Sequence, residues 1–140
     1  MKRKLFGLLA TLAMAPAANV TAHHSFSAEF DREQPITLTG TVTKLEWTNP
    51  HARIYIDVKD ASGNVSNWDF ELGPPNGLMR LGWNRNSLRQ GHVVTINGFL
   101  SKAQANVANA RTVHLADGRQ VFAGSSFDTT EGAARTPASQ

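Results

Sequence analysis

The chain has 140 residues and no cysteine, which excludes disulfide bonds and thiolate metal sites. Its formal charge of +3 comes from three basic residues at positions 2 to 4, since the part after residue 22 carries eleven basic and eleven acidic residues. That part is neutral and lacks the clustered positive charge that nucleic-acid binding requires, so we expect no nucleic-acid partner.

The first 22 residues, MKRKLFGLLATLAMAPAANVTA, are typical of a secretory signal peptide. They combine a basic start, an apolar run over residues 5–15 and small residues up to Ala22. The apolar run is shorter than the roughly 20 residues that a membrane span requires. We therefore expect cleavage after Ala22, a mature chain that begins at His23 without a membrane span, and a location in the periplasm or outside the cell.

Residues 25–35, SFSAEFDREQP, show no regular hydrophobic period, and we expect an ordered arm packed by its two phenylalanines, Phe26 and Phe30. Apolar and polar residues then alternate over residues 36–47, and the parity of the apolar positions switches after Val42. Alternation predicts a half-buried strand, and a switch of parity within it predicts a β-bulge. The first strand is therefore predicted to be strongly bent.

The Asn-Pro pair at 49–50 ends this strand, because proline cannot donate to a β-ladder. A second strand is predicted over residues 53–58 and a third over residues 65–72, joined by the hairpin loop KDASGN at 59–64. The side chains expected to point inward from these two strands are Ile54, Ile56, Val58, Trp68 and Phe70. The three strands form a meander.

Helical spacing replaces alternation after the third strand. Asn76 is a suitable N-cap, Leu78 and Leu81 lie three residues apart on one helical face, and Gly82 is placed to end the helix. We therefore expect a short helix that plugs one end of the molecule.

Three further strands are predicted over residues 92–100, 111–115 and 120–122, with Val94 and Ile96 inward in the first of them. An Asp-Gly pair at 117–118 makes the turn between the last two. The residues beyond Phe127 are small and polar, and we expect 128–140 to be a disordered tail.

A three-stranded meander, a helix and then two or three strands is the element order of an OB-fold. A β-sandwich is the alternative, but it usually has about seven strands and no central helix. We therefore predict an all-β fold: a small OB-like barrel of five or six strands with one short helix between strands three and four. Residues 23–127 form its single domain, including the N-terminal arm.

Four stretches resemble a known family: HHSF at 23–26, GTVTKLEWTNPH from Gly40, WDFELGPPNGLMRLGW from Trp68 and NARTVHLADGRQVFAGSS from Asn109. They are similar to a group of small exported bacterial proteins that is known only as a domain of unknown function, and the Trp-x-Asn-Pro-His string is the most specific element. The resemblance covers nearly the whole mature chain. It implies an OB-like or similar small β-barrel and no particular activity.

His23, as a free amino-terminal residue, would offer its α-amine and its ring as one chelate for Cu or Zn. A third nitrogen from His24 or His51 would complete a T-shaped copper site of the histidine-brace kind. The alternative is that His23 and His24 are a soluble start and that His51 is a turn residue bonded to backbone. His92 and His114 lie in later strands and are weaker candidates.

A second group of residues points to a ligand on the face of strands two and three, where OB-folds bind sugars or bases on aromatic side chains. The alternative is that the three tryptophans belong to the core, which we favour for Trp68. The candidate ligand-binding residues are Trp47, Asn49, His51, Tyr55 and Trp83.

No catalytic motif stands out, because the chain has no G-x-S-x-G elbow, no H-E-x-x-H helix and no phosphate loop. Glu46, Asp57, Asp69 and Glu71 alternate along strands, and solvated strand faces account for them. We therefore expect an exported, non-enzymatic module that binds an unidentified protein, glycan or small ligand. The alternative is a periplasmic copper-binding protein.

Overall fold

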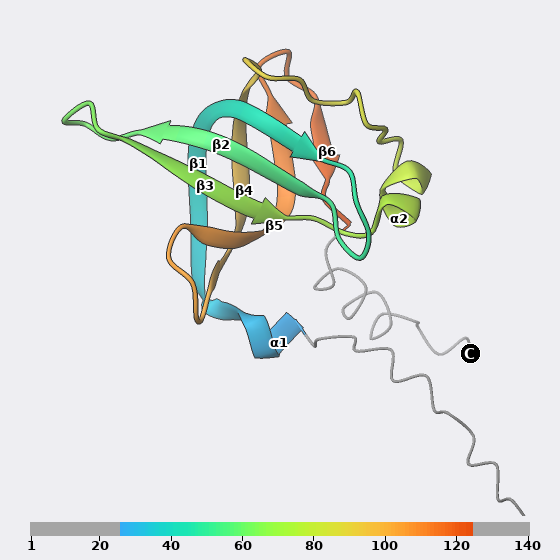
Figure 1. Ribbon diagram of the computed structural model, residues 1–140, viewed down its shortest axis with the longest axis horizontal. Coiled ribbons are helices and arrows are strands. Elements are labelled where there is room, and N and C mark those ends of the chain that lie inside the picture. The colour runs from blue at the N-terminus through green and yellow to red at the C-terminus, as the bar shows by residue number, and fades with distance from the viewer. Residues whose placement is uncertain (1–25, 125–140) are drawn as a thin grey trace, which may run out of the picture.

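The computed structural model describes residues 26–124, so the predictions for the signal peptide, for His23 and His24 and for the tail at 128–140 lie outside the described residues. Figure 1 shows strands wrapped into a barrel with a helix at each of two ends. The elements within the described residues are α1 (Phe26–Glu29), β1 (Phe30–Glu46), β2 (Arg53–Lys59), β3 (Val65–Glu71), α2 (Pro75–Arg80), β4 (Val93–Ser101), β5 (Val107–Leu115) and β6 (Gln120–Phe122).

The strands form one sheet in the order β3-β2-β1-β4-β5-β6, and an additional parallel pairing of β3 with β5 closes it. The closed ring is therefore β1-β2-β3-β5-β4, with β6 added on the far side of β5. A five-stranded barrel with a helix between β3 and β4 is the OB architecture, and it confirms the predicted fold class.

β1 is a long bent strand that pairs with both β4 and β2. Its first part pairs with β4 and its last part with β2, and the register shifts between Val42 and Lys44, which confirms the predicted bulge. Gly40 lies where β1 crosses between its two partners, and a Cβ there would be 2.6 Å from the carbonyl oxygen of Asp57. Only glycine allows β1 and β2 to approach this closely.

The barrel interior is filled by the inward side chains of all five ring strands together with residues of α2 and the segment after it. The predicted inward residues Ile54, Ile56, Val94 and Ile96 are all buried, at 0–1% exposure. Trp68 and Val58 are partly buried and pack against this core. The alternation of β2 and β4 was therefore a reliable guide to the core.

The N-cap of the helix between β3 and β4 lies two residues earlier than predicted, and the helix ends at Arg80. Asn76 is not its N-cap: Pro74 holds that position without a side-chain hydrogen bond, and Pro75 occupies the first turn, where a missing N–H costs nothing. Leu78 is fully buried, but Leu81 follows the helix and is 49% exposed. Gly82, at φ 89°, ends the helix as predicted. Within residues 26–124, neither helix is long and apolar enough to cross a membrane.

The N-terminal arm is ordered, as expected, and it contains regular secondary structure that its lack of a hydrophobic period did not predict. Its first residues form α1, and β1 begins at Phe30, six residues before the predicted start. Phe26 and Phe30 do pack as expected. They meet Phe99 of β4 in a second, smaller core outside the barrel, with ring centroids 5.5 Å apart for Phe26–Phe30 and 5.7 Å for Phe26–Phe99.

β5 begins at Val107, four residues before the predicted start. The missed residues include Ala108 and Ala110, which are buried in the barrel, and Asn109, which lies on the opposite face. Alanine and asparagine have low strand propensity, so local sequence does not predict this part of the strand. It is nevertheless the part that pairs with β3 and closes the barrel.

Candidate binding site

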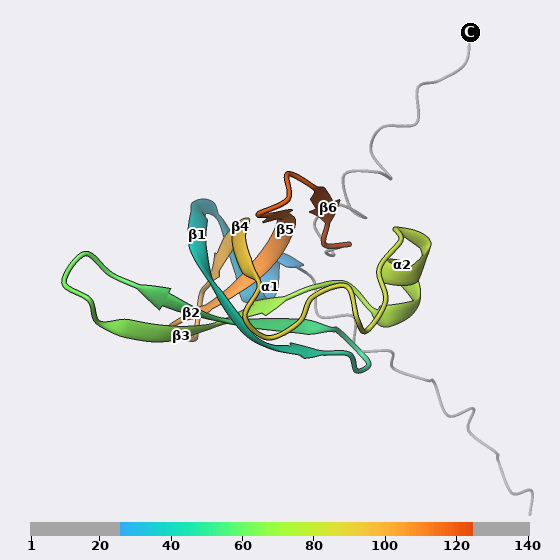
Figure 2. The same ribbon diagram turned by 90° about the horizontal axis from the view of Figure 1, so that it is seen from above.

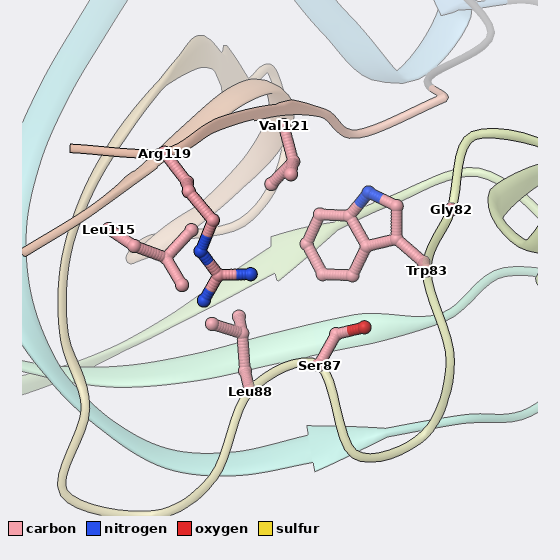
Figure 3. A pocket seen from close by; sticks show the side chains of 7 residues that line it. All are labelled: Gly82, Trp83, Ser87, Leu88, Leu115, Arg119 and Val121. Carbon is pink, nitrogen blue, oxygen red and sulfur yellow. The ribbon is translucent and has the colours of Figure 1, made fainter. Parts of the chain in front are cut away.

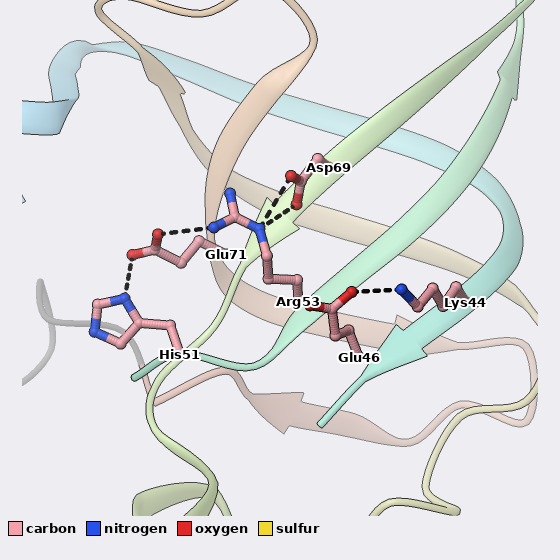
Figure 4. Close-up of polar contacts among 6 residues, drawn as sticks. All are labelled: Lys44, Glu46, His51, Arg53, Asp69 and Glu71. Carbon is pink, nitrogen blue, oxygen red and sulfur yellow. Dashed lines mark hydrogen bonds and ion pairs between the residues drawn. The ribbon is translucent and has the colours of Figure 1, made fainter. Parts of the chain in front are cut away.

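A connected set of charged side chains lies on the outer face of β2 and β3, at the end of the barrel nearest α1 (Figure 4). Arg53 of β2 is paired in register with Glu71 of β3, so both side chains leave the same face of the sheet. The Nε–H of Arg53 donates to both carboxylate oxygens of Asp69, at 2.8 and 3.0 Å. Its Nη1 lies 3.5 Å from Oε2 of Glu71.

His51 extends this set from the turn that precedes β2. Its Nδ1 lies 2.8 Å from Oε1 of Glu71, so the Nδ1–H donates to the carboxylate. The carboxylate of Glu71 is therefore placed between an imidazole on one oxygen and a guanidinium on the other, as Figure 4 shows.

Glu71 is only 7% exposed, in contrast to the solvated position predicted for it. Burial raises the pKa of Glu71 above its usual range, and the nearby charge of Glu29 adds to this, whereas His51 and Arg53 act in the opposite direction. The prediction of a solvated strand face was wrong because β3 and β5 are paired here and α1 lies close by. Neither feature can be read from the alternation of β3.

A cavity of about 290 Å³ adjoins this carboxylate. Ala28 and Glu29 of α1 form one wall. The others come from the strands and from the loop between β4 and β5: Phe30, Arg53, Glu71, Ser101, Ala103, Gln104 and Val107. The cavity volume is at the lower end of the range for small-molecule sites, so it suits a small ligand.

Charged residues give this cavity an acidic character. Its lining contains two carboxylates, Glu29 and Glu71, and one guanidinium, that of Arg53. Arg53 already donates to both carboxylate oxygens of Asp69, and this offsets the positive charge of the Arg53 guanidinium. The lining therefore favours a positively charged group over an anion.

Asn109 is an additional polar residue beside Glu71. The two residues are register partners in the parallel β3–β5 pairing, so their side chains share the outer face. Asn109 is 1% exposed, and neither amide atom has a hydrogen-bond partner within the described residues. Buried amides without partners are rare, which sets this position apart from the rest of the fold.

The predicted ligand-binding residues other than His51 do not gather around this cavity. Trp47 is partly buried against the barrel core. Asn49 is exposed in the turn after β1, where it precedes Pro50 in a cis peptide bond. Tyr55 is partly exposed on β2, with the Lys44 ammonium 5.3 Å from its ring centroid.

Trp83 is a core residue, at 3% exposure, and its indole N–H donates to the carbonyl oxygen of Phe122 at 3.0 Å. It borders a second cavity together with Leu88, Leu115, Val121 and the side chain of Arg119 (Figure 3). That cavity measures about 50 Å³, far below the size of ligand sites. The burial of Trp83 and its indole hydrogen bond are those of a core side chain.

The structure describes three of the five histidines that were considered as metal ligands. His51 belongs to the charged set described above, while His23 and His24 lie outside the described residues. His92 is exposed just before β4, and His114 is on β5. Residues 26–124 contain no group of three or more His, Asp or Glu side chains placed to hold a metal ion.

Sequence reasoning identified His51 but missed Glu71, Arg53 and Asn109. A weak signal was present: Arg53 follows the Asn-Pro-His string by two residues, and Asp69 and Glu71 are the only acidic residues of the third strand. Their convergence depends on the β2–β3 register and on the β3–β5 closure, which are long-range pairings.

Comparison with known proteins places the chain in a family. A family model described as a family of unknown function (DUF6152) matches residues 10–109, more than half of the chain, so the chain belongs to this family. No curated protein matches it significantly. Among solved structures it is similar to a mitochondrial single-stranded DNA-binding protein from S. cerevisiae, Rim1, with 11% sequence identity and a TM-score of 0.45, over 62% of this chain and 94% of that chain.

Proposed function

We propose that this protein is an exported, non-enzymatic binding protein whose ligand is a small cation or carries a cationic group. The ligand occupies the acidic cavity between α1 and the ends of β2 and β3. The observation that carries this proposal is the carboxylate of Glu71, which is 7% exposed and borders the cavity.

A carboxylate that is buried away from water loses the free energy of its hydration. Burial disfavours the ionised form and raises the pKa of Glu71, and the partial compensation comes from His51 at 2.8 Å and Arg53 at 3.5 Å. The 3.5 Å separation is too long for a strong hydrogen bond. A cation in the cavity would supply the missing compensation, so the protein without ligand holds a site already organised for positive charge.

Export is supported by the first 22 residues, which have the three parts of a signal peptide in order. The expected mature protein begins at His23. Intact-mass measurement of protein recovered from the periplasm tests this directly. A mature protein that still carries Lys2, Arg3 and Lys4 would contradict export with cleavage.

The binding proposal is tested by titrating mature protein, labelled with ¹⁵N, with Cu(II), spermidine and, as an anionic comparison, citrate. We expect spermidine to shift the amide resonances of Glu29, Glu71 and residues 101–107, Cu(II), which is paramagnetic, to broaden them, and citrate to leave them unchanged. Glu71→Gln keeps the shape of the side chain and removes its charge. It should weaken cation binding roughly tenfold or more, the usual effect of losing a charged hydrogen-bond partner.

Asp117→Asn is the matched control. Asp117 is an exposed carboxylate in the turn between β5 and β6, and it pairs with Arg119 outside the cavity. Its neutralisation should leave cation binding unchanged. Equal losses in the two variants would mean that overall charge, and not the cavity, attracts the cations, and the proposal would fail.

A further inference from the structure

The chain between β3 and β4, which includes α2, lies against one end of the barrel (Figure 1). We call residues 74–92 the capping segment. Its side chains Leu78, Trp83 and Leu88 are buried in the main core, at 0–3% exposure, and anchor the segment to the barrel. Residues 79–82, 84–86 and 89–92 are all exposed. The anchors therefore leave the rest of the segment facing solvent.

The capping segment is basic, although the chain after residue 22 is neutral as a whole. It contains Arg80, Arg85 and Arg89, and no acidic residue occurs anywhere from position 72 to position 116. The three guanidinium groups form no ion pair with another residue of the described part of the chain. The neutral total thus conceals a local concentration of positive charge that is open to an anionic partner.

Two tight turns set the positions of two of these arginines. In the first turn the backbone N–H of Asn84 donates to Oγ of Ser87 at 2.8 Å, and the N–H of Ser87 donates to the carbonyl oxygen of Asn84 at 2.9 Å. Arg85 lies at the tip of this turn. In the second turn the backbone N–H of His92 donates to the carbonyl oxygen of Arg89 at 3.1 Å. Both arginines are therefore presented by ordered backbone.

Two large apolar side chains are exposed beside the first arginine. Met79 is 53% exposed and Leu81 is 49% exposed, and they flank Arg80 in the sequence. Exposed apolar side chains among cationic ones are typical of surfaces that bind a membrane interface, where the apolar groups enter the boundary between headgroups and acyl chains. A nucleic acid offers phosphates but no apolar layer for Met79 and Leu81. These two residues therefore favour a lipid surface.

We propose that the capping segment binds the surface of an anionic lipid bilayer without crossing it. Arg80, Arg85 and Arg89 contact the lipid phosphates, for which the guanidinium group is well suited, and Met79 and Leu81 enter the interface. Each arginine near such a surface raises the affinity roughly fivefold, so the three together contribute about two orders of magnitude. The attachment is reversible, because stable anchoring requires a stronger apolar signal than two side chains.

This surface is separate from the cation cavity, since no residue of the capping segment lines that cavity. The two proposals can therefore fail independently.

The test is co-sedimentation of mature protein, which lacks the basic and apolar residues 2–15, with lipid vesicles. One set of vesicles is pure phosphatidylcholine, and the other contains equal amounts of phosphatidylcholine and phosphatidylglycerol. We expect roughly tenfold or greater preference for the anionic vesicles. Binding to them should weaken as salt is added, because salt screens exposed charges.

Arg85→Gln combined with Arg89→Gln should lower the affinity for the anionic vesicles roughly 25-fold, fivefold for each charge. Lys44→Gln combined with Lys59→Gln is the matched control, because it removes the same charge from exposed residues of β1 and β2 outside the capping segment. It should leave the affinity within about twofold of the parent, since charges far from the lipid surface are screened. Equal losses in the two double variants would mean that overall charge drives binding and would overturn the proposal.

Met79→Ser combined with Leu81→Ser tests the apolar contribution. Both residues are exposed, and circular dichroism melts establish that the variant is folded. We expect its affinity for the anionic vesicles to fall roughly tenfold, because each side chain transfers part of its apolar surface out of water on binding. An unchanged affinity in this variant would overturn the proposal. Binding of a single-stranded oligodeoxynucleotide without any binding of vesicles would also overturn it and would make nucleic acid the partner of the capping segment.

Discussion

Single residues decide how closely the strands of this small barrel can approach. At Gly98, on β4, a Cβ would lie 1.7 Å from the carbonyl oxygen of Asn109 on β5, beside the register shift between Asn97 and Gly98. The partner atom is backbone, so it cannot move without distorting β5. Glycine is therefore required at this position by contact and not by a turn.

We predict that Gly98→Ala destabilises the protein by about 1–3 kcal/mol, the usual cost of forcing an extra methyl group into a packed region. Urea unfolding measures the change. Gly77→Ala is the control, because a Cβ there meets nothing closer than 3.6 Å and alanine is the better helix former by about 1 kcal/mol. It should be neutral or stabilising, and a Gly98→Ala protein as stable as the parent would disprove the contact.

Asn109 is the residue whose presence the fold explains least, since its buried amide has no partner within the described residues. Replacement by leucine, which has a similar shape, removes both unsatisfied groups. We expect Asn109→Leu to be more stable than the parent by about 1–3 kcal/mol, the cost of an unpaired buried amide. Thermal unfolding at neutral pH measures this. A loss of stability would show that the amide is satisfied by water.

Whole elements were predictable where their side chains alternate locally. The bulge in β1, the inward face of β2 and β4 and the short β6 were all expected from the pattern. The start of β5 and the helix α1 were not, because alanine, serine and asparagine carry little pattern, and distant partners hold these residues in place.

Only part of the candidate site could be predicted from the sequence. His51 could be selected by residue type and by its place behind Asn49 and Pro50. Glu71 could not, because its burial depends on β5 and α1, which approach from the two ends of the sequence. Alternation predicts which face of a strand a residue occupies, but not what covers the outer face.

We expect the hairpin loop between β2 and β3 to stabilise the protein by an amount that depends on pH. The carboxylate of Asp60 accepts hydrogen bonds from the backbone N–H groups of Ser62 and Asn64 and from the Asn64 amide. These bonds, the Asn64 side chain first, lower the pKa of Asp60 from 3.8. Because the folded pKa is depressed, this stabilisation is present above pH 3.8 and is lost as the pH falls through the folded value.

An NMR titration of the Asp60 carboxyl carbon should therefore give a pKa below 3.8 in the parent. Asn64→Ala removes the side-chain donor but keeps the backbone one, so the pKa of Asp60 should move upward. An unchanged Asp60 pKa in this variant would contradict the loop structure.

At the scale of the whole molecule, the barrel interior and the candidate site are separate layers. Figure 2 shows the β2–β3 hairpin extending to one side of the barrel and α2 lying at the other. The main core fills the barrel, while Phe26, Phe30 and Phe99 form a second cluster next to the cavity. The site is therefore built on the outside of a closed barrel, between its wall and the N-terminal arm.

The separation of layers predicts opposite results for two changes on β2. Ile56 is fully buried, so Ile56→Asp places an unpaired charge in the core and should destabilise the protein by about 4 kcal/mol or more, enough to unfold many small domains. Lys59→Asp, at the exposed end of the same strand, should change stability by less than about 1 kcal/mol. Circular dichroism melts compare them, and equal melts would mean that the inward face of β2 is misassigned.

The most direct test of the cation site is the affinity of the mature protein for spermidine, measured by isothermal titration calorimetry in the parent, in Glu71→Gln and in Asp117→Asn. We predict that Glu71→Gln loses affinity roughly tenfold or more, because the carboxylate that borders the cavity is neutralised, and that Asp117→Asn binds like the parent. Equal affinity in all three proteins would contradict the cation site.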